Sequence, residues 1–60
     1  MFPVGTAVYG YTYSDQGRVR VEGVVVSITD DPEEYNQDYI IRQEDGSMVY
    51  CDEQETYQAP

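Results

Sequence analysis

Three tyrosines stand at alternate positions near the start of the chain, within the stretch VYGYTY at residues 8–13. They are Tyr9, Tyr11 and Tyr13. Alternate residues of an extended strand share one face, so this spacing predicts a stripe of tyrosines along a strand. A tyrosine ring attracts cations to its π face, and its hydroxyl forms hydrogen bonds. The stripe is therefore a candidate contact for a basic ligand.

A second group of chemically active residues lies in the acidic segment DDPEEYNQ. Four carboxylates and one more tyrosine gather there: Asp30, Asp31, Glu33, Glu34 and Tyr35. Carboxylates form ion pairs with Lys and Arg side chains, and they also hold Ca²⁺ or Mg²⁺ through oxygen. The segment lacks the ligand spacing and the glycine of an EF-hand loop. We therefore expect a solvated acidic loop, with no metal site and no cofactor.

The net charge of −9 arises in the second half of the chain. Residues 1–29 carry two acidic and two basic side chains, whereas residues 30–60 carry ten carboxylates and only Arg42. Binding to DNA or RNA normally depends on Lys and Arg against phosphates, and the sequence has no Lys. The charge should repel polyanions and attract basic partners. Acidity that serves only solubility is the alternative interpretation.

Catalytic residue types are scarce, since the 60-residue chain has no His. No nucleophile lies beside a base, and carboxylates in solvated loops are poor general acids at neutral pH. The single Cys51 can form no internal disulfide and has no second Cys or His for a metal. We expect it to be a small, half-buried apolar residue in a protein of a reducing compartment. The sequence predicts no enzymatic activity.

Length and hydropathy indicate one small domain spanning residues 1–60. At this size, folding buries only ~60% of the surface of the unfolded chain, so the core is thin. The start MFPVG lacks the basic and apolar segments of a signal peptide. No apolar stretch approaches the ~20 residues of a membrane helix. We therefore expect a soluble, cytoplasmic protein that does not enter a membrane.

Strand signals dominate the rest of the sequence. Runs of β-branched and aromatic residues bounded by turn residues predict five strands, at about residues 6–13, 18–29, 38–44, 47–52 and 56–58. Gly23 interrupts the second strand where strict alternation becomes a continuous apolar run, which indicates a bulge or sharp bend. Such a bend allows one strand to serve two sheets and helps to close a barrel. Asp52 and Glu55 have the spacing of a capping box, which predicts a single helical or 3₁₀ turn before the last strand.

The third and fourth strands flank the dipeptide Asp45-Gly46, a strong signal for a two-residue hairpin. With this turn, Glu44 faces Ser47, and a like-charge pair of Asp38 and Glu53 weakens the far end. The face with the larger apolar groups is then expected in the core. It comprises Tyr39, Ile41, Gln43, Met48, Tyr50 and Asp52.

The first strand can turn either of its faces inward. If the tyrosines are inside, Val8 is outside, and the reverse arrangement puts the tyrosines on the surface. The interior of a 60-residue barrel is too narrow for three such rings in a row. We therefore expect at least two of Tyr9, Tyr11 and Tyr13 to be exposed, with packing against the neighbouring strand as the alternative role.

The order of elements resembles the Src-homology-3-like small barrels of the Tudor and KOW kind. The stretches that carry the resemblance are VGTAVYGY, VEGVVVSI and YIIRQEDGSMVY, within roughly residues 4–58. The resemblance implies an all-β, five-stranded, strongly bent antiparallel barrel. Members of this class are mostly non-enzymatic, and they bind methylated Lys or Arg, nucleic acid, or a larger enzyme such as RNA polymerase. This chain departs from the nucleic-acid-binding members because it has no basic surface.

Three functional hypotheses follow. The first is an acidic module that docks on a basic surface of a larger protein, in its specific form a nucleic-acid mimic that inhibits a DNA- or RNA-binding protein, as small acidic proteins of phages or mobile elements do. The second is a barrel that binds single-stranded nucleic acid through Arg18, Arg20 and the tyrosines. The third is an assembly subunit or homodimer that pairs through an edge strand. We favour the first, with Tyr9, Tyr11, Tyr13 and Tyr35 as aromatic contacts and Asp30, Asp31, Glu33 and Glu34 as acidic contacts.

Overall fold

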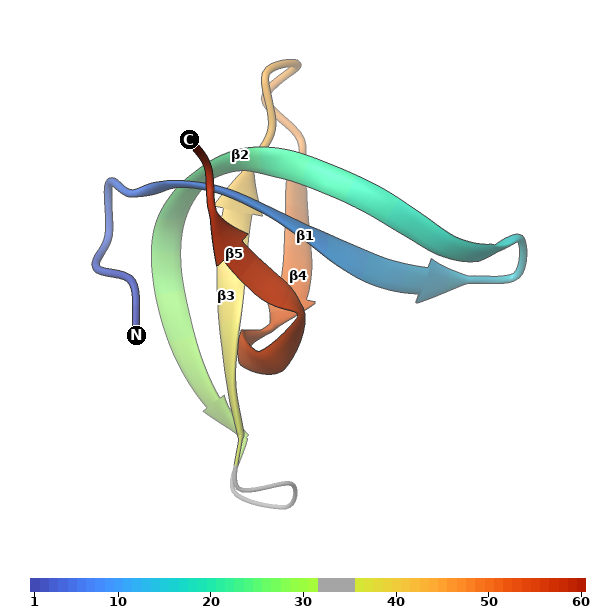
Figure 1. Ribbon diagram of the computed structural model, residues 1–60, viewed down its shortest axis with the longest axis horizontal. Coiled ribbons are helices and arrows are strands. Elements are labelled where there is room, and N and C mark those ends of the chain that lie inside the picture. Colours follow the sequence, from blue (N-terminus) through green and yellow to red (C-terminus); the bar gives the residue numbers. More distant parts are fainter. Residues whose placement is uncertain (32–35) are drawn as a thin grey trace.

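The computed structural model describes residues 1–31 and 36–60, with the side chains of residues 30, 31, 36 and 37 left out. Five strands form one antiparallel sheet with the order β4-β3-β2-β1-β5 (Figure 1). The elements are β1 (Ala7–Ser14), β2 (Gly17–Asp31), β3 (Asn36–Arg42), β4 (Met48–Asp52), the 3₁₀ turn η1 (Glu53–Glu55) and β5 (Thr56–Gln58). The five predicted strands and the predicted turn are confirmed, to within two residues at each end. In the described part of the chain, no helix has the length and hydropathy to cross a membrane.

The long strand β2 connects the two halves of the sheet because it bends (Figure 1). Its first part pairs with β1 up to Val24, and its second part pairs with β3 from Val24 onward. A β-bulge interrupts the second ladder between Val25 and Ser27. At Gly23, an added Cβ would lie 2.0 Å from the carbonyl oxygen of Arg42, so only glycine permits this approach of the two backbones. The predicted bend is confirmed, and the glycine and the bulge together produce it.

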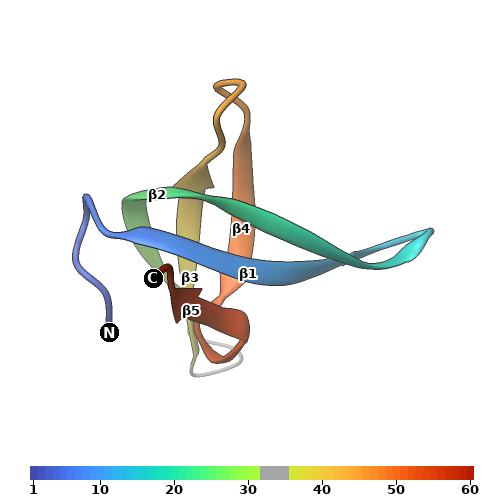
Figure 2. The same ribbon diagram turned by 45° about the horizontal axis from the view of Figure 1, so that its top comes forward.

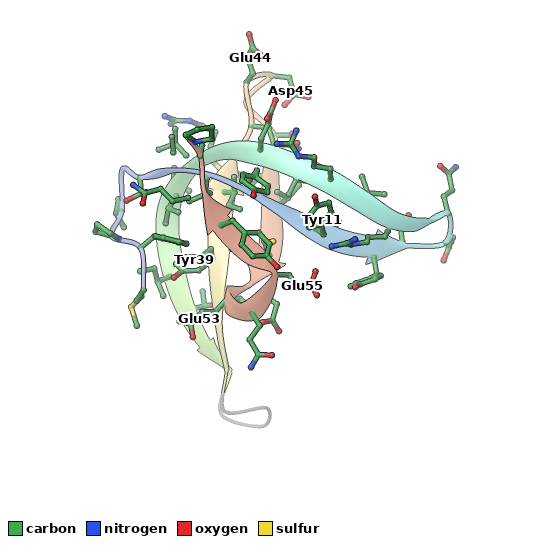
Figure 3. The ribbon with its side chains drawn as sticks, viewed as in Figure 1. Tyr11, Tyr39, Glu44, Asp45, Glu53 and Glu55 are labelled. Carbon is green, nitrogen blue, oxygen red and sulfur yellow. The ribbon has the colours of Figure 1, made fainter. Side chains whose placement is uncertain are left out.

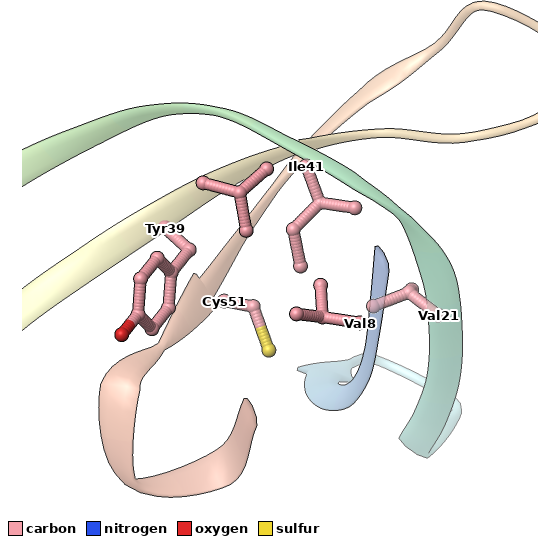
Figure 4. Close-up of a cluster of buried hydrophobic side chains, with 6 residues drawn as sticks. Val8, Val21, Tyr39, Ile41 and Cys51 are labelled. Atoms are coloured by element: carbon pink, nitrogen blue, oxygen red, sulfur yellow. The ribbon is translucent and has the colours of Figure 1, made fainter. Parts of the chain in front are cut away.

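The core is a small cluster of buried side chains contributed by β1 to β4 (Figure 4). It comprises Val8, Val21, Val25, Tyr39, Ile41 and Cys51. Phe2 packs against its edge, and the backbone N–H of Phe2 donates a hydrogen bond of 2.9 Å to the hydroxyl of Tyr39. The buried hydroxyl of Tyr39 thereby has a hydrogen-bond partner, as a buried polar group requires. Cys51 is the buried apolar residue that we expected, although its burial is nearly complete.

The register predicted for the β3–β4 hairpin is wrong by one residue. Tyr39 lies opposite Cys51, and Ile41 lies opposite Val49. The loop contains three residues instead of two, because the backbone N–H of Gly46 donates to the carbonyl oxygen of Gln43 and Gly46 has a φ of 90°. A type I turn followed by a left-handed glycine is the usual three-residue hairpin.

The shift reverses the face of every side chain on β4, since the side-chain period of a strand is two. Met48 and Tyr50, expected in the core, are exposed, and Cys51 takes the buried place. On β3, Tyr39 and Ile41 are buried as predicted. Asp38 lies opposite Asp52 instead of Glu53, so a like-charge pair still occupies this end of the ladder.

The turn η1 folds the chain back onto β1. The side chain of Asp52 accepts a hydrogen bond of 2.8 Å from the backbone N–H of Gln54, which confirms its role as the N-cap. After this turn, β5 pairs with the first half of β1, where Tyr57 lies opposite Tyr9. The sheet therefore has β4 and β5 at its two ends, and its closure into a barrel stays a prediction.

Candidate functional site

The tyrosine stripe lies on the outer face of β1. Val8 points into the core, with only 1% of its surface exposed, which confirms that Tyr9, Tyr11 and Tyr13 point away from it. Their exposure is smaller than expected. Tyr13 is 70% exposed, whereas Tyr9 and Tyr11 are half-buried, so the expectation of at least two exposed rings is wrong.

Two arginines of the neighbouring strand account for this burial. The guanidinium carbon of Arg18 lies 3.7 Å from the ring centroid of Tyr11, and that of Arg20 lies 4.8 Å from the ring centroid of Tyr9. In the ladder, Tyr13 faces Arg18 and Tyr11 faces Arg20. Each arginine therefore contacts the tyrosine that is diagonal to it, within reach of a long side chain. Both contacts have the geometry of cation–π interactions.

The row of rings continues onto β5. Tyr57 stacks on Tyr9 at a centroid distance of 5.4 Å, and Tyr9 meets Tyr11 edge to face at 6.4 Å. We call this surface the tyrosine–arginine face, and its members are Tyr9, Tyr11, Tyr13, Tyr57, Arg18 and Arg20.

The sequence contained the signal for the contacts between tyrosines and arginines, because the turn at Asp15 and Gln16 fixes which arginine faces which tyrosine. The sequence analysis combined the two arginines with the stripe only as a possible surface for nucleic acid, without predicting contacts between them.

Each of these arginines also lies near a carboxylate. Arg20 Nη1 lies 3.4 Å from Glu22 Oε2, and Arg18 Nη2 lies 3.8 Å from Glu55 Oε2. Glu22 is an exposed residue of the same strand, whereas Glu55 comes from η1, far along the chain. The contact of Arg18 therefore connects the β1–β2 hairpin with the end of the chain.

A hollow of about 530 Å³ opens beside Tyr11, where β1 passes β4 and η1. Three tyrosines and two carboxylates are among its lining residues, which are Tyr11, Thr12, Tyr13, Tyr50, Asp52, Gln54 and Glu55. We call it the tyrosine–carboxylate hollow. Figure 3 shows Tyr11 on β1 and Glu55 below it, beside η1. Aromatic faces beside carboxylates form an environment suited to a cationic side chain.

Close approach of β1 to β4 produces the hollow. The thiol of Cys51 donates to the carbonyl oxygen of Tyr11 at 3.5 Å. At Gly10, an added Cβ would lie 2.5 Å from the sulfur of Cys51 and 2.7 Å from the carbonyl oxygen of Glu55. The absence of a side chain at Gly10 thus allows β1 to cross both elements, and the exposed Tyr50 of β4 then lies near Tyr13.

One carboxylate oxygen at this site lacks a hydrogen bond. Glu55 Oε2 is buried and has no hydrogen-bond partner among the described residues. Arg18 Nη2, at 3.8 Å, is too far away to donate one. Buried carboxylate oxygens normally accept hydrogen bonds, and leaving one unpaired costs free energy. Asp52 differs, since its side chain is held by the cap of η1.

The acidic contacts predicted from the sequence lie mostly beyond the part of the structure that can be described. Glu33, Glu34 and Tyr35 lie outside the described residues, and Asp30 and Asp31 are placed only as backbone at the end of β2. The described carboxylates that line the hollow are Glu55 and Asp52. The sequence analysis treated both as parts of a turn, and it also placed Asp52 on the expected core face of the hairpin, whereas Asp52 is only half-buried. No group of acidic, His or Cys side chains within residues 1–31 and 36–60 has the arrangement of a metal site.

Comparison with known proteins adds no relative. No family model and no curated protein matches the sequence, and no solved structure matches the fold.

Proposed function

We propose that this protein is a non-enzymatic binding module that docks on a basic surface of a larger protein. The observation that carries the proposal is the tyrosine–carboxylate hollow, in which exposed rings of β1 and β4 lie beside the carboxylates of Asp52 and Glu55. Tyr13 and Tyr50 are 70% and 63% exposed, although large aromatic rings are normally covered in a folded protein. Tyrosine is enriched at the centres of protein interfaces because its large ring carries a polar tip.

The charge of the chain supports a basic partner. Both carboxylates of the hollow, Asp52 and Glu55, come from the half of the sequence that carries ten carboxylates against Arg42 alone. A surface of this kind attracts basic proteins over a distance and accelerates their association. In its specific form, the proposal is a nucleic-acid mimic whose spaced carboxylates replace phosphates on a DNA- or RNA-binding protein. The bent sheet and the contact of β1 with β4 are consistent with a barrel of the Src-homology-3-like kind as its scaffold.

Direct binding of single-stranded nucleic acid fits the described residues less well. That hypothesis requires Arg18 and Arg20 to reach phosphates while the tyrosines stack on bases. Both guanidinium groups already lie on the rings of Tyr11 and Tyr9 and close to carboxylates. Even if both guanidinium groups moved away from the rings, the nucleic acid would be repelled by a chain with a net charge of −9.

The test is capture of partners from a host lysate by the wild-type protein and by the double variant Tyr13→Ala, Tyr50→Ala, at low and at high salt. Both tyrosines are largely exposed, so their removal should leave the fold intact. We expect the wild-type protein to retain a basic nucleic-acid-handling protein at low salt, and DNA to compete with it. The double variant should bind the purified partner about tenfold more weakly, as truncation of two interface anchors does.

Met48→Ala is the matched control, because Met48 is an exposed residue of β4 that does not line the hollow. The affinity of the Met48→Ala variant for the partner should equal that of the wild-type protein. Retention of no basic protein, or an affinity that stays constant from low to high salt, would contradict the proposal.

A further inference from the structure

We propose that the tyrosine–carboxylate hollow recognises arginine, and that Arg18, which lies on the same ring and carboxylate from beside the hollow, is an internal competitor that an arginine of the partner displaces. The inference rests on the proposed function, since it names the side chain through which a basic partner would bind. It adds a selectivity for arginine over lysine and a competition within the chain. Neither follows from the acidity of the surface alone.

The contacts of Arg18 show which chemistry the site accepts. Its guanidinium carbon lies 3.7 Å from the centroid of the Tyr11 ring, and its Nη2 points toward Glu55 at 3.8 Å. Tyr11 and Glu55 both line the hollow, whereas Arg18 does not. The same ring and the same carboxylate are therefore shared between the chain's own cation and the adjoining hollow. An aromatic face beside a carboxylate matches the planar fork of arginine, which stacks and donates at the same time.

The fit of Arg18 to this site is incomplete. At 3.8 Å, its ion pair with Glu55 is longer than a hydrogen bond, and Glu55 Oε2 remains buried without a donor. The Arg18 side chain is 54% exposed, so it is free to move into solvent. An arginine that enters through the hollow could hydrogen-bond Glu55 and stack on Tyr11, which would satisfy the oxygen that Arg18 leaves unpaired. Replacement of Arg18 by the partner's arginine would therefore stabilise the complex.

Arg20 supplies a matched control within the same strand. It has the same charge, it lies on the ring of Tyr9, and it pairs with Glu22 at 3.4 Å. Neither Tyr9 nor Glu22 lines the hollow. Removal of Arg20 therefore changes the net charge by the same amount as removal of Arg18, but it opens no site beside the hollow.

The experiment measures the binding of oligo-arginine and oligo-lysine peptides of equal length to the full-length protein. Fluorescence anisotropy at fixed ionic strength compares the wild-type protein with Arg18→Gln, Arg20→Gln and Glu55→Gln. We expect the wild-type protein to bind the arginine peptide more tightly. Arg18→Gln should increase that affinity about fivefold, because removal of a weak internal competitor raises the competent fraction by about this factor. Arg20→Gln should produce only the small increase due to charge, and Glu55→Gln should remove the preference for arginine.

The possible failures separate the two proposals. If neither peptide binds the wild-type protein, the docking function itself is wrong. If both peptides bind equally and Arg18→Gln behaves like Arg20→Gln, docking by charge stands and the arginine site is wrong. A loss of affinity in Arg18→Gln also overturns the inference, because Arg18 would then take part in binding. Thermal unfolding of each variant confirms that the protein measured is folded.

Discussion

Gly23 lies against the backbone of Arg42, where the chain leaves no room for a side chain. A methyl group there would meet the carbonyl oxygen of Arg42 at 2.0 Å, and this oxygen belongs to a paired backbone that cannot withdraw. Gly23→Ala should therefore lower the free energy of unfolding by about 3 kcal/mol. A domain of this size has only ~3–5 kcal/mol available, so the variant should retain about 0–2 kcal/mol and be only marginally folded. Urea denaturation followed by circular dichroism measures the effect.

Gly17→Ala is the control, because it replaces a glycine at a position where an added Cβ meets no neighbouring atom. Nothing lies within 4 Å of the position of its Cβ, but its φ of 99° disfavours alanine. Its expected cost is about 1 kcal/mol. Equal costs at the two positions would show that the close approach at Gly23 is relaxed in solution.

Asp45 provides a prediction about pH. The hydroxyl of Ser47 donates to Asp45 Oδ1 at 2.6 Å, and the backbone N–H of Ser47 donates to the same oxygen at 2.9 Å. These hydrogen bonds favour the carboxylate and lower the pKa of Asp45 below its usual value. A lowered pKa in the folded state stabilises the protein above the unfolded pKa of Asp, and this stabilisation is lost as the pH falls through the folded value.

Ser47→Ala removes the larger of these two contributions, so the pKa of Asp45 should rise toward its usual value and part of the pH dependence should disappear. An NMR titration of the Asp45 carboxyl carbon in both proteins measures the change. An unchanged pKa in Ser47→Ala would show that the hydroxyl does not donate to this carboxylate.

At the scale of elements, the β3–β4 hairpin shows what local sequence decides. Both a two-residue and a three-residue loop are compatible with Glu44, Asp45 and Gly46, and each places a different set of β4 residues inside. The sequence favours the first because Met48 and Tyr50 are the larger apolar groups. The structure has the second, since the core beneath β1 has room only for the smaller Cys51, which lies against the backbone of Tyr11. A distant strand thus decides the register.

The register can be tested through the thiol. In the structure, Cys51 is 2% exposed, whereas the rejected register would turn it outward. We expect a thiol reagent to modify Cys51 at a rate limited by unfolding, so that the rate rises with denaturant. Tyr50→Ala should change the free energy of unfolding by less than about 0.5 kcal/mol, because the ring is exposed. Immediate modification in native buffer would support the two-residue loop.

On the outer face of β1, in contrast to the β3–β4 hairpin, the local sequence decides the arrangement. Alternation of Tyr9, Tyr11 and Tyr13, together with the narrow interior, was sufficient to predict which face is outside. The contacts of the two arginines are also local, because the turn after Ser14 sets the pairing. The hollow could not be predicted, since it requires β1 to cross β4 and η1, elements about 40 residues later in the chain. Local pairing is therefore readable from the sequence here, and the candidate site is not.

The whole molecule has an elongated part, the β1–β2 hairpin, which projects beyond the rest of the sheet (Figure 2). Two-stranded ribbons are marginally stable alone. In this hairpin, Arg18 contacts Tyr11 across the strands and lies near Glu55 of η1. These contacts support the projecting part against the body of the protein. If a partner's arginine displaces Arg18 as proposed, these supporting contacts are lost and the hairpin should loosen.

The net charge of −9 leads to a final prediction, in which salt acts in opposite directions on folding and on binding. Repulsion among the carboxylates destabilises the folded state, and salt screens it. Between about 10 and 100 mM salt, the screening length falls from roughly 30 Å to roughly 10 Å. The melting temperature should therefore rise over this range, while the affinity for a basic partner should fall because the same carboxylates attract it. Calorimetry and anisotropy on one protein sample measure both quantities.

If the melting temperature rises but the affinity stays constant, the acidity serves the solubility of the chain and the partner binds elsewhere. If both fall together, salt weakens the fold itself, and the ion pairs of the tyrosine–arginine face outweigh the repulsion.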